Sequence, residues 1–193
     1  MWNYSDKLMD HFMNPRNSGQ LPDPDGHSEV GSPQCGDAMT LDINVDDEDR
    51  ISEIRFMTFG CAGAIAAASA LTELARGCTL KEAVDIENRS IVEYLGGMPE
   101  EKYHCSVMGH EALALAVEDF QRKRERTADQ VRRTLHHLET RGLLEPGAAE
   151  IEHVHPSRVL IRMHAGDRKE LKVALEKAIG EQGNSSVEVR VTE

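Results

Sequence analysis

The sequence predicts an α+β protein in which a small antiparallel sheet is packed by helices and is followed by a smaller α+β unit. Residues 40–45 and 51–59 alternate apolar and polar side chains on either side of the acidic run at 46–49. This pattern is typical of an antiparallel hairpin. Segments with helical spacing surround the hairpin, and a second pattern of helices and strands follows residue 126.

The chain before the hairpin contains helix and loop signals. Ser5 is a suitable N-cap for a short helix that ends before Pro15. One side of this helix is expected to be apolar, with Leu8, Met9, Phe12 and Met13. Residues 16–34 are rich in proline and glycine and are predicted to form a loop.

Four helical segments are expected after the hairpin in the first part of the chain. Residues 63–76 are rich in alanine. Thr79 and Ser90 are each followed three residues later by glutamate, the pattern of a capping box at a helix start. The last helix runs from about Gly109, with apolar residues at helical spacing.

The second part of the chain reads helix, strand, strand, helix, strand. Its first helix ends at Gly142, and residues 149–154 and 159–163 have strand character. A second amphipathic helix is expected over 169–179 and a last strand over 187–191. We place the domain boundary in the charged segment after residue 120, giving domains 1–126 and 127–193.

Charge and cysteine content differ between these domains. Residues 1–126 have 12 Lys and Arg against 23 Asp and Glu, whereas residues 127–193 have 10 against 11. The net charge of −12 argues against a nucleic-acid-binding protein, which needs a basic face. The sequence has neither an apolar run long enough to span a bilayer nor a secretory signal, so we expect a cytoplasmic protein with no membrane association.

Three of the four cysteines have local contexts suited to metal binding. Cys35 lies in a turn that enters a strand, Cys61 lies where a strand ends and a helix begins, and Cys105 follows His104 at a helix start. A helix N-terminus favours the thiolate, which binds zinc and iron–sulfur clusters and attacks sulfur electrophiles. The separations of 26 and 44 positions are unlike those of zinc modules, so the residues alone also allow buried structural thiols. Cys78 has no neighbouring Asp or His and is interpreted as a surface or semi-buried thiol that is not a ligand.

Together the motifs resemble the iron–sulfur cluster scaffold family of IscU and the N-terminal domain of NifU, and are closest to NifU. They occur in the family's order across residues 1–126. The matching segments are Tyr4-Ser5-Asp6-Lys7 through Asn14-Pro15-Arg16-Asn17, Cys35-Gly36-Asp37, Thr58-Phe59-Gly60-Cys61 and Lys102-Tyr103-His104-Cys105-Ser106-Val107-Met108-Gly109.

The resemblance implies an assembly scaffold rather than a turnover enzyme. Such a protein accepts persulfide sulfur from a NifS- or IscS-type cysteine desulfurase, binds iron, builds a transient [2Fe–2S] cluster and passes it to apo iron–sulfur proteins. Cys35, Cys61 and Cys105 correspond to the three thiolate ligands, with Cys105 as first candidate for sulfur acceptor and Cys35 as second. His104 corresponds to a fourth ligand, and Asp37 to a residue associated with iron entry and cluster lability.

The same ligand set would hold zinc in the isolated protein, and a homodimer is compatible with the family. The alternative function is a zinc-stabilised adaptor or sulfur-relay protein that activates a desulfurase without building clusters. Met98-Pro99-Glu100-Glu101-Lys102 differs from the chaperone-docking segment of IscU proteins, so an Hsp70-type partner is not expected. The second domain resembles the C-terminal Nfu-type domain of NifU but lacks its Cys-x-x-Cys, so we interpret it as a degenerate module without a second cluster.

Overall fold

The computed structural model describes residues 4–31, 36–163, 169, 172–174, 177 and 188–192. The chain divides into two compact units, residues 1–120 and 121–193, and each is treated by itself. The division falls within the long helix α5 (Tyr103–Thr140), so the chain is helical where the two units meet in the sequence.

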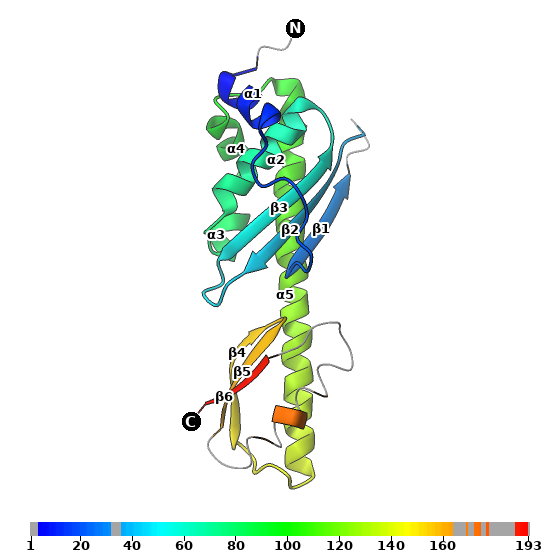
Figure 1. Ribbon diagram of the computed structural model, residues 1–193, viewed down its shortest axis with the longest axis vertical. Coiled ribbons are helices and arrows are strands. Elements are labelled where there is room, and N and C mark those ends of the chain that lie inside the picture. Colours follow the sequence, from blue (N-terminus) through cyan, green and yellow to red (C-terminus); the bar gives the residue numbers. More distant parts are fainter. Residues whose placement is uncertain are drawn as a thin grey trace. The chain divides into compact units, whose positions relative to one another are not determined.

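The first unit contains a three-stranded antiparallel sheet in the order β1-β2-β3. Its strands are β1 (Gly26–Gly31), β2 (Ala38–Val45) and β3 (Ile51–Phe59), and β2 and β3 form the predicted hairpin. Helix α5 lies behind this sheet, and the segment between the first helix and β1 crosses its front (Figure 1). A parallel bridge between Ser18 and Phe56 joins that segment to β3.

Helices flank the sheet in the order α1, α2, α3, α4 and α5. The sequence correctly places the N-cap of α1 at Ser5, and both hydrogen bonds of the capping box at Thr79 are present. The remaining bounds are α1 (Asp6–Met13), α2 (Ala62–Ala75), α3 (Leu80–Val84), α4 (Asn88–Tyr94) and the 3₁₀ helix η1 (Glu100–Lys102).

The core of the first unit forms between the sheet and the helices. Its largest fully buried side chains include Leu41 and Ile43 of β2, Ile54 of β3, Leu71 of α2 and Phe120 of α5. Alanines of α2 are buried along most of that helix, because their small side chains allow close packing. The predicted fold class, a small antiparallel sheet packed by helices, is confirmed for this unit.

Three predictions about local structure are wrong. Residues 26–31 form strand β1 rather than a loop, because the buried positions of this strand are Gly26 and Ser28 and give no apolar alternation. Helix α4 begins at Asn88, so Ser90 lies inside it and does not cap it. Helix α5 begins at Tyr103, ahead of the expected start near Gly109.

The apolar face expected for α1 is correct for Leu8 and for Phe12, which packs against the core, and wrong for the two methionines. Leu8 is fully buried, but Met9 and Met13 are exposed, and the other buried side chain of this helix is His11. A polar partner inside the core makes this burial favourable, because His11 Nδ1 lies 2.8 Å from Ser69 Oγ in α2.

The second unit contains the C-terminal part of α5 and a three-stranded sheet in the order β4-β5-β6. β4 (Ala149–His155) and β5 (Arg158–Met163) form the predicted hairpin, and β6 (Glu188–Thr192) runs parallel to β5. Residues 169, 172–174 and 177 are helical, and the rest of the helix expected at 169–179 lies outside the described residues. Within the described part of the chain, no helix has both the length and the apolar character needed to cross a membrane.

Candidate metal centre

Four of the five predicted site residues converge at one end of the first unit. Asp37 immediately precedes β2, Cys61 is the N-cap of α2, and His104 and Cys105 are in the first turn of α5. Cys35 lies outside the described residues. Three elements that are distant in sequence therefore supply the donor atoms.

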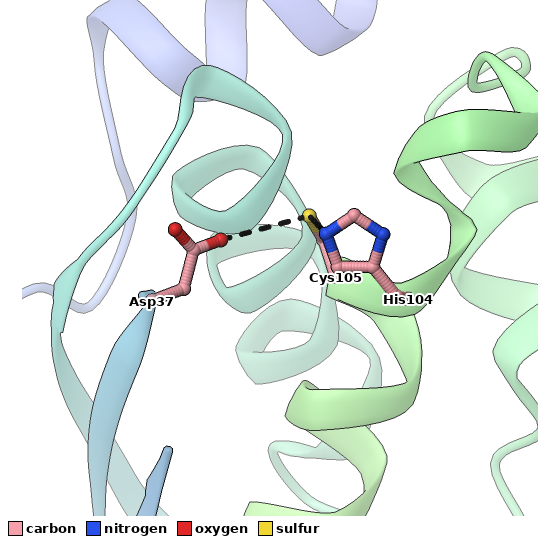
Figure 2. A group of neighbouring side chains, drawn as sticks. All are labelled: Asp37, His104 and Cys105. Atoms are coloured by element: carbon pink, nitrogen blue, oxygen red, sulfur yellow. Dashed lines mark hydrogen bonds between the residues drawn. The ribbon is translucent and has the colours of Figure 1, made fainter. Parts of the chain in front are cut away.

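The sulfur of Cys105 is at the centre of this group. It lies 3.6 Å from Cys61 Sγ, 3.5 Å from His104 Nε2 and 3.9 Å from Asp37 Oδ2. Figure 2 shows the carboxylate of Asp37 and the ring of His104 on two sides of this sulfur. Among the described residues, Asp37, His104 and Cys105 are the one group of three such side chains whose donor atoms all lie within 4.8 Å of one another.

The site is only partly open to solvent. Cys105 is fully buried and Asp37 is 6% exposed, whereas Cys61 and His104 are half-buried. A buried carboxylate needs a charged or hydrogen-bonded partner, because water no longer solvates it. A metal ion among these donors would supply that partner.

The charge of Cys61 affects two further side chains of the first unit. Negative charge on Cys61 raises the pKa of Lys102, which also hydrogen-bonds to this cysteine. Burial raises the pKa of Tyr4, and the charge on Cys61 raises it further. Both residues belong to segments that carry the family resemblance, but no role was predicted for either side chain. Their position next to Cys61 depends on tertiary contacts, because both are remote from it in the sequence.

Gly60 allows the carboxylate of Asp37 to approach the turn before α2. A Cβ atom at position 60 would lie 2.9 Å from Asp37 Cγ and 2.9 Å from Ala64 Cβ. Real Cβ atoms essentially never have such short contacts, so a larger residue would displace the side chain of Asp37. Gly60 belongs to the motif Thr58-Phe59-Gly60-Cys61, but the motif does not reveal this packing requirement.

Cys78 lies apart from the other two described thiols. It follows the C-terminal end of α2, whereas Cys61 is at the N-terminal end, and a 14-residue helix is about 21 Å long. Its sulfur donates to the carbonyl oxygen of Leu74 at 3.2 Å. Cys78 is half-buried, which agrees with its interpretation as a semi-buried thiol that is not a ligand.

Sulfur, imidazole nitrogen and carboxylate oxygen together form a donor set suited to a borderline divalent metal. Zinc is bound by these three atom types, usually with four ligands in tetrahedral geometry. Iron in clusters is held mainly by thiolates, and histidine replaces cysteine at some sites. The arrangement therefore has the chemistry of a metal or iron–sulfur site with mixed ligands.

Comparison with known proteins identifies the family. Residues 3–127 match the family described as NifU-like N terminal domain. This chain belongs to that family. The match covers most of the first unit and all of the predicted site residues.

The relatives extend this result. The chain is 52% identical over 120 residues to the iron–sulfur cluster assembly scaffold protein IscU 1 of Archaeoglobus fulgidus. This alignment covers 62% of this chain and 78% of that protein. It is 49% identical over 127 residues to the nitrogen fixation protein NifU of Trichormus azollae, covering 62% of this chain and 42% of that protein. The chain thus matches less than half of the longer NifU proteins. The family is one of assembly scaffolds rather than enzymes, as the resemblance predicted.

A solved structure has the same fold. The crystal structure of the N-terminal part of a NifU-like protein from Brucella abortus matches with a TM-score of 0.53 and 20% sequence identity. The match covers 62% of this chain and 94% of that chain. At this identity, the similarity supports the fold of the first unit.

Proposed function

We propose that this protein assembles [2Fe–2S] clusters on Asp37, Cys61, His104 and Cys105, together with Cys35, and transfers them to apo iron–sulfur proteins. The observation that carries the proposal is the 3.6 Å separation of the Cys61 and Cys105 sulfur atoms, with the donor atoms of Asp37 and His104 beside Cys105. Membership of a family that contains IscU scaffold proteins supports it.

The mixed ligand set suits a cluster that must be released. Thiolates bind iron firmly, whereas imidazole and carboxylate ligands are lost more readily on protonation. A site with two or three thiolates and one or two such ligands therefore holds a cluster less permanently than four thiolates. Release is needed for transfer to an acceptor protein.

Sulfur enters by thiol–disulfide chemistry in this proposal. The acceptor thiolate attacks the outer sulfur of the desulfurase persulfide, the S–S bond breaks, and the desulfurase cysteine leaves as a thiolate. Conversion of the transferred sulfur to sulfide needs two electrons from a thiol or a ferredoxin-type reductant. Cys105 is the first candidate for acceptor and Cys35 the second, and the burial of Cys105 means that its surroundings must open for this attack.

Reconstitution with a cysteine desulfurase, cysteine and ferrous iron tests the proposal. Wild-type protein is expected to develop visible absorption from a cluster with equal amounts of iron and acid-labile sulfide. Cys35→Ala, Cys61→Ala and Cys105→Ala should abolish it, and Cys78→Ala is the matched control that should not. Equal tolerance of all four substitutions would contradict the proposal.

A second readout separates a scaffold from a zinc-stabilised relay protein. The same four described donors suit zinc, so metal binding alone does not distinguish the two functions. A scaffold transfers its cluster to apo-ferredoxin, whereas a relay protein retains zinc and transfers sulfur without iron. Peptide mapping of the persulfide by mass spectrometry identifies the acceptor cysteine in either case.

We also propose that this protein acts in the cytoplasm and that a cysteine desulfurase and apo iron–sulfur proteins are its partners. Relatives differ in location, since one from Debaryomyces hansenii is named as mitochondrial. Measuring desulfurase activity with and without this protein tests the first partnership.

A further inference from the structure

A histidine and a buried carboxylate face each other on the front of the first sheet, away from the cysteines. His27 of β1 and Asp42 of β2 are cross-strand partners, and His27 Nδ1 lies 2.6 Å from Asp42 Oδ1. The other carboxylate oxygen of Asp42 accepts the backbone N–H of Leu21 at 2.9 Å. Asp42 is 3% exposed, so both of its oxygen atoms are used inside the protein.

This pairing determines which nitrogen of neutral His27 has a free lone pair. An ionised carboxylate only accepts hydrogen bonds, so Nδ1 must carry the proton that it donates to Asp42. Nε2 is then the unprotonated nitrogen and can bind a metal. The same carboxylate–histidine arrangement orients metal-binding histidines and makes them more basic.

Glu29 supplies a second donor atom beside Nε2. It is two residues from His27 on the same face of β1, and its Oε1 lies 3.6 Å from His27 Nε2. Two ligands at zinc-like bond lengths in tetrahedral geometry would be about 3.4 Å apart. The side chains of His27 and Glu29 are 39% and 76% exposed, so a hydrated ion has access to both.

The backbone that carries these ligands is held in place by α5. The N–H of His27 donates to Asp119 at 3.1 Å, and Ser28 Oγ donates to the carbonyl oxygen of Ala112 at 2.7 Å. Both ligands are therefore on a fixed strand, with the imidazole oriented by Asp42. Such support is what a weak surface site needs in order to bind one ion in a defined geometry.

The pair is separate from the cysteine site but lies on the same sheet. Gly31, Ala38 and Phe59 are cross-strand neighbours at the end of the sheet that leads to the cysteines. His27 is four residues from Gly31 along β1, and Asp42 is four residues from Ala38 along β2, which corresponds to about 13 Å. Of the two proposed ligands, Glu29 also lines a groove of about 400 Å³. Thr40, Ala38 and Phe59 are among the other residues that line this groove. Ala38 directly follows Asp37, and Phe59 is two residues before Cys61.

We propose that His27 and Glu29 form a second, weaker site for a first-row divalent cation such as Zn²⁺ or Fe²⁺, with Asp42 as the positioning residue. An imidazole nitrogen combined with one carboxylate suits this class of ion, and water would complete its coordination. The site is independent of cluster assembly and does not use any cysteine. Its failure would therefore leave the proposed scaffold function untouched.

Zinc titration of a chain without thiols tests the site. In a background with all four cysteines changed to serine, we expect one bound Zn²⁺ in competition with a chromogenic chelator. His27→Gln and Glu29→Gln should each weaken this binding at least about tenfold, and Asp42→Asn about 10- to 100-fold. His136→Gln, which changes an exposed histidine of α5, is the matched control and should have no effect.

A second measurement uses the wild-type chain, in case the serine background does not fold. Mn²⁺ prefers carboxylate and water oxygens to thiolates, so Mn²⁺ bound at Glu29 and His27 should broaden the amide signals of residues 27–29 and 40–42. His27→Gln should remove this broadening. Unchanged zinc binding or unchanged broadening in His27→Gln would overturn the proposal, as would the absence of binding in both experiments.

Discussion

The carboxylate of Asp37 is positioned by the absence of a side chain at Gly60. The added Cβ of an alanine would lie 2.9 Å from Asp37 Cγ and 3.2 Å from its Oδ1. The same Cβ would lie 2.9 Å from Ala64 Cβ, which cannot rotate away, so the first turn of α2 must also shift slightly. Because the side chain of Asp37 can rotate, Gly60→Ala should displace the carboxylate, and this effect imitates the loss of Asp37 without removing it.

We predict that Gly60→Ala gives a cluster that persists longer against a chelator than the wild-type cluster, as Asp37→Ala should also do. The reason is that in the proposed scaffold Asp37 makes the cluster labile, and its displaced carboxylate would no longer reach the metal. Decay of the visible absorption after chelator addition measures the effect. In the double variant Gly60→Ala/Asp37→Ala, decay should match that of Asp37→Ala, and additive effects would contradict this explanation.

His11 is a buried histidine whose protonation is unfavourable in the folded protein. It is 1% exposed, its Nδ1 contacts Ser69, and its Nε2 lies 3.5 Å from Glu73 Oε2. Burial lowers its pKa below 6.5, and the positive charge of Arg16 lowers it further. Lys7 also lowers this pKa, whereas Glu73 and Asp10 oppose the shift.

The lowered pKa of His11 predicts a loss of stability in mild acid. Between the folded-state pKa and 6.5, the unfolded chain binds more protons, so the free energy of unfolding falls as the pH decreases below about 6.5. Urea denaturation at pH 7.5, 6.5 and 5.5 measures this. His11→Gln should lose less stability over this range than wild type, whereas His136→Gln should behave as wild type. Identical pH dependence in wild type and His11→Gln would refute the prediction.

Strand β1 is held in the sheet by close contact with α5. A Cβ atom at Gly26 would lie 2.2 Å from the carbonyl oxygen of Ala116, a backbone atom that cannot rotate away. A Cβ atom at Gly31, at the other end of the same strand, would meet its nearest atom at 3.9 Å. The two glycines thus have different packing requirements in one element.

We predict that Gly26→Ala destabilises the first unit by about 1–3 kcal/mol or more, because β1 must separate from α5. Gly31→Ala is the matched control and should change stability little. Urea denaturation followed by circular dichroism compares the two variants. Similar stabilities for both would show that β1 is not packed against α5 in this way.

The described residues form two separate hydrophobic cores. The buried cluster of the first unit ends at Phe120, and that of the second begins at Val131 and includes Val159 and Ile161. The described donor atoms of the metal centre all belong to the first unit. No cysteine follows Cys105 in the sequence, so the second unit has no thiolate for cluster binding.

We predict that a fragment of residues 1–127 assembles the same amount of cluster per chain as the full protein, because it contains the complete first core. Iron and acid-labile sulfide analysis after reconstitution measures this amount. Transfer to apo-ferredoxin is the second readout, and a change in transfer alone would assign a regulatory role to the second unit. Loss of assembly in a folded fragment would contradict the prediction.

Much of the local structure could be predicted from the sequence, because it depends on neighbouring residues. The hairpin of β2 and β3 follows from alternation around an acidic turn, and the starts of α1 and α3 follow from Ser5 and Thr79 as caps. Strand β1 could not be predicted, since its inward residues are small and it is stabilised by contacts with α5. The same limit applies to His11, whose burial depends on a serine 58 positions away.

The sequence by itself determined the family and the chemical identity of the candidate metal donors, because both follow from short motifs that occur in a fixed order. Only the tertiary structure brought two sulfurs 44 positions apart to within 3.6 Å and placed a carboxylate and an imidazole beside them. It also placed Lys102 next to Cys61, and His27 between Asp42 and Glu29. These distances arise from packing between segments remote in the chain, which local patterns of residues do not encode.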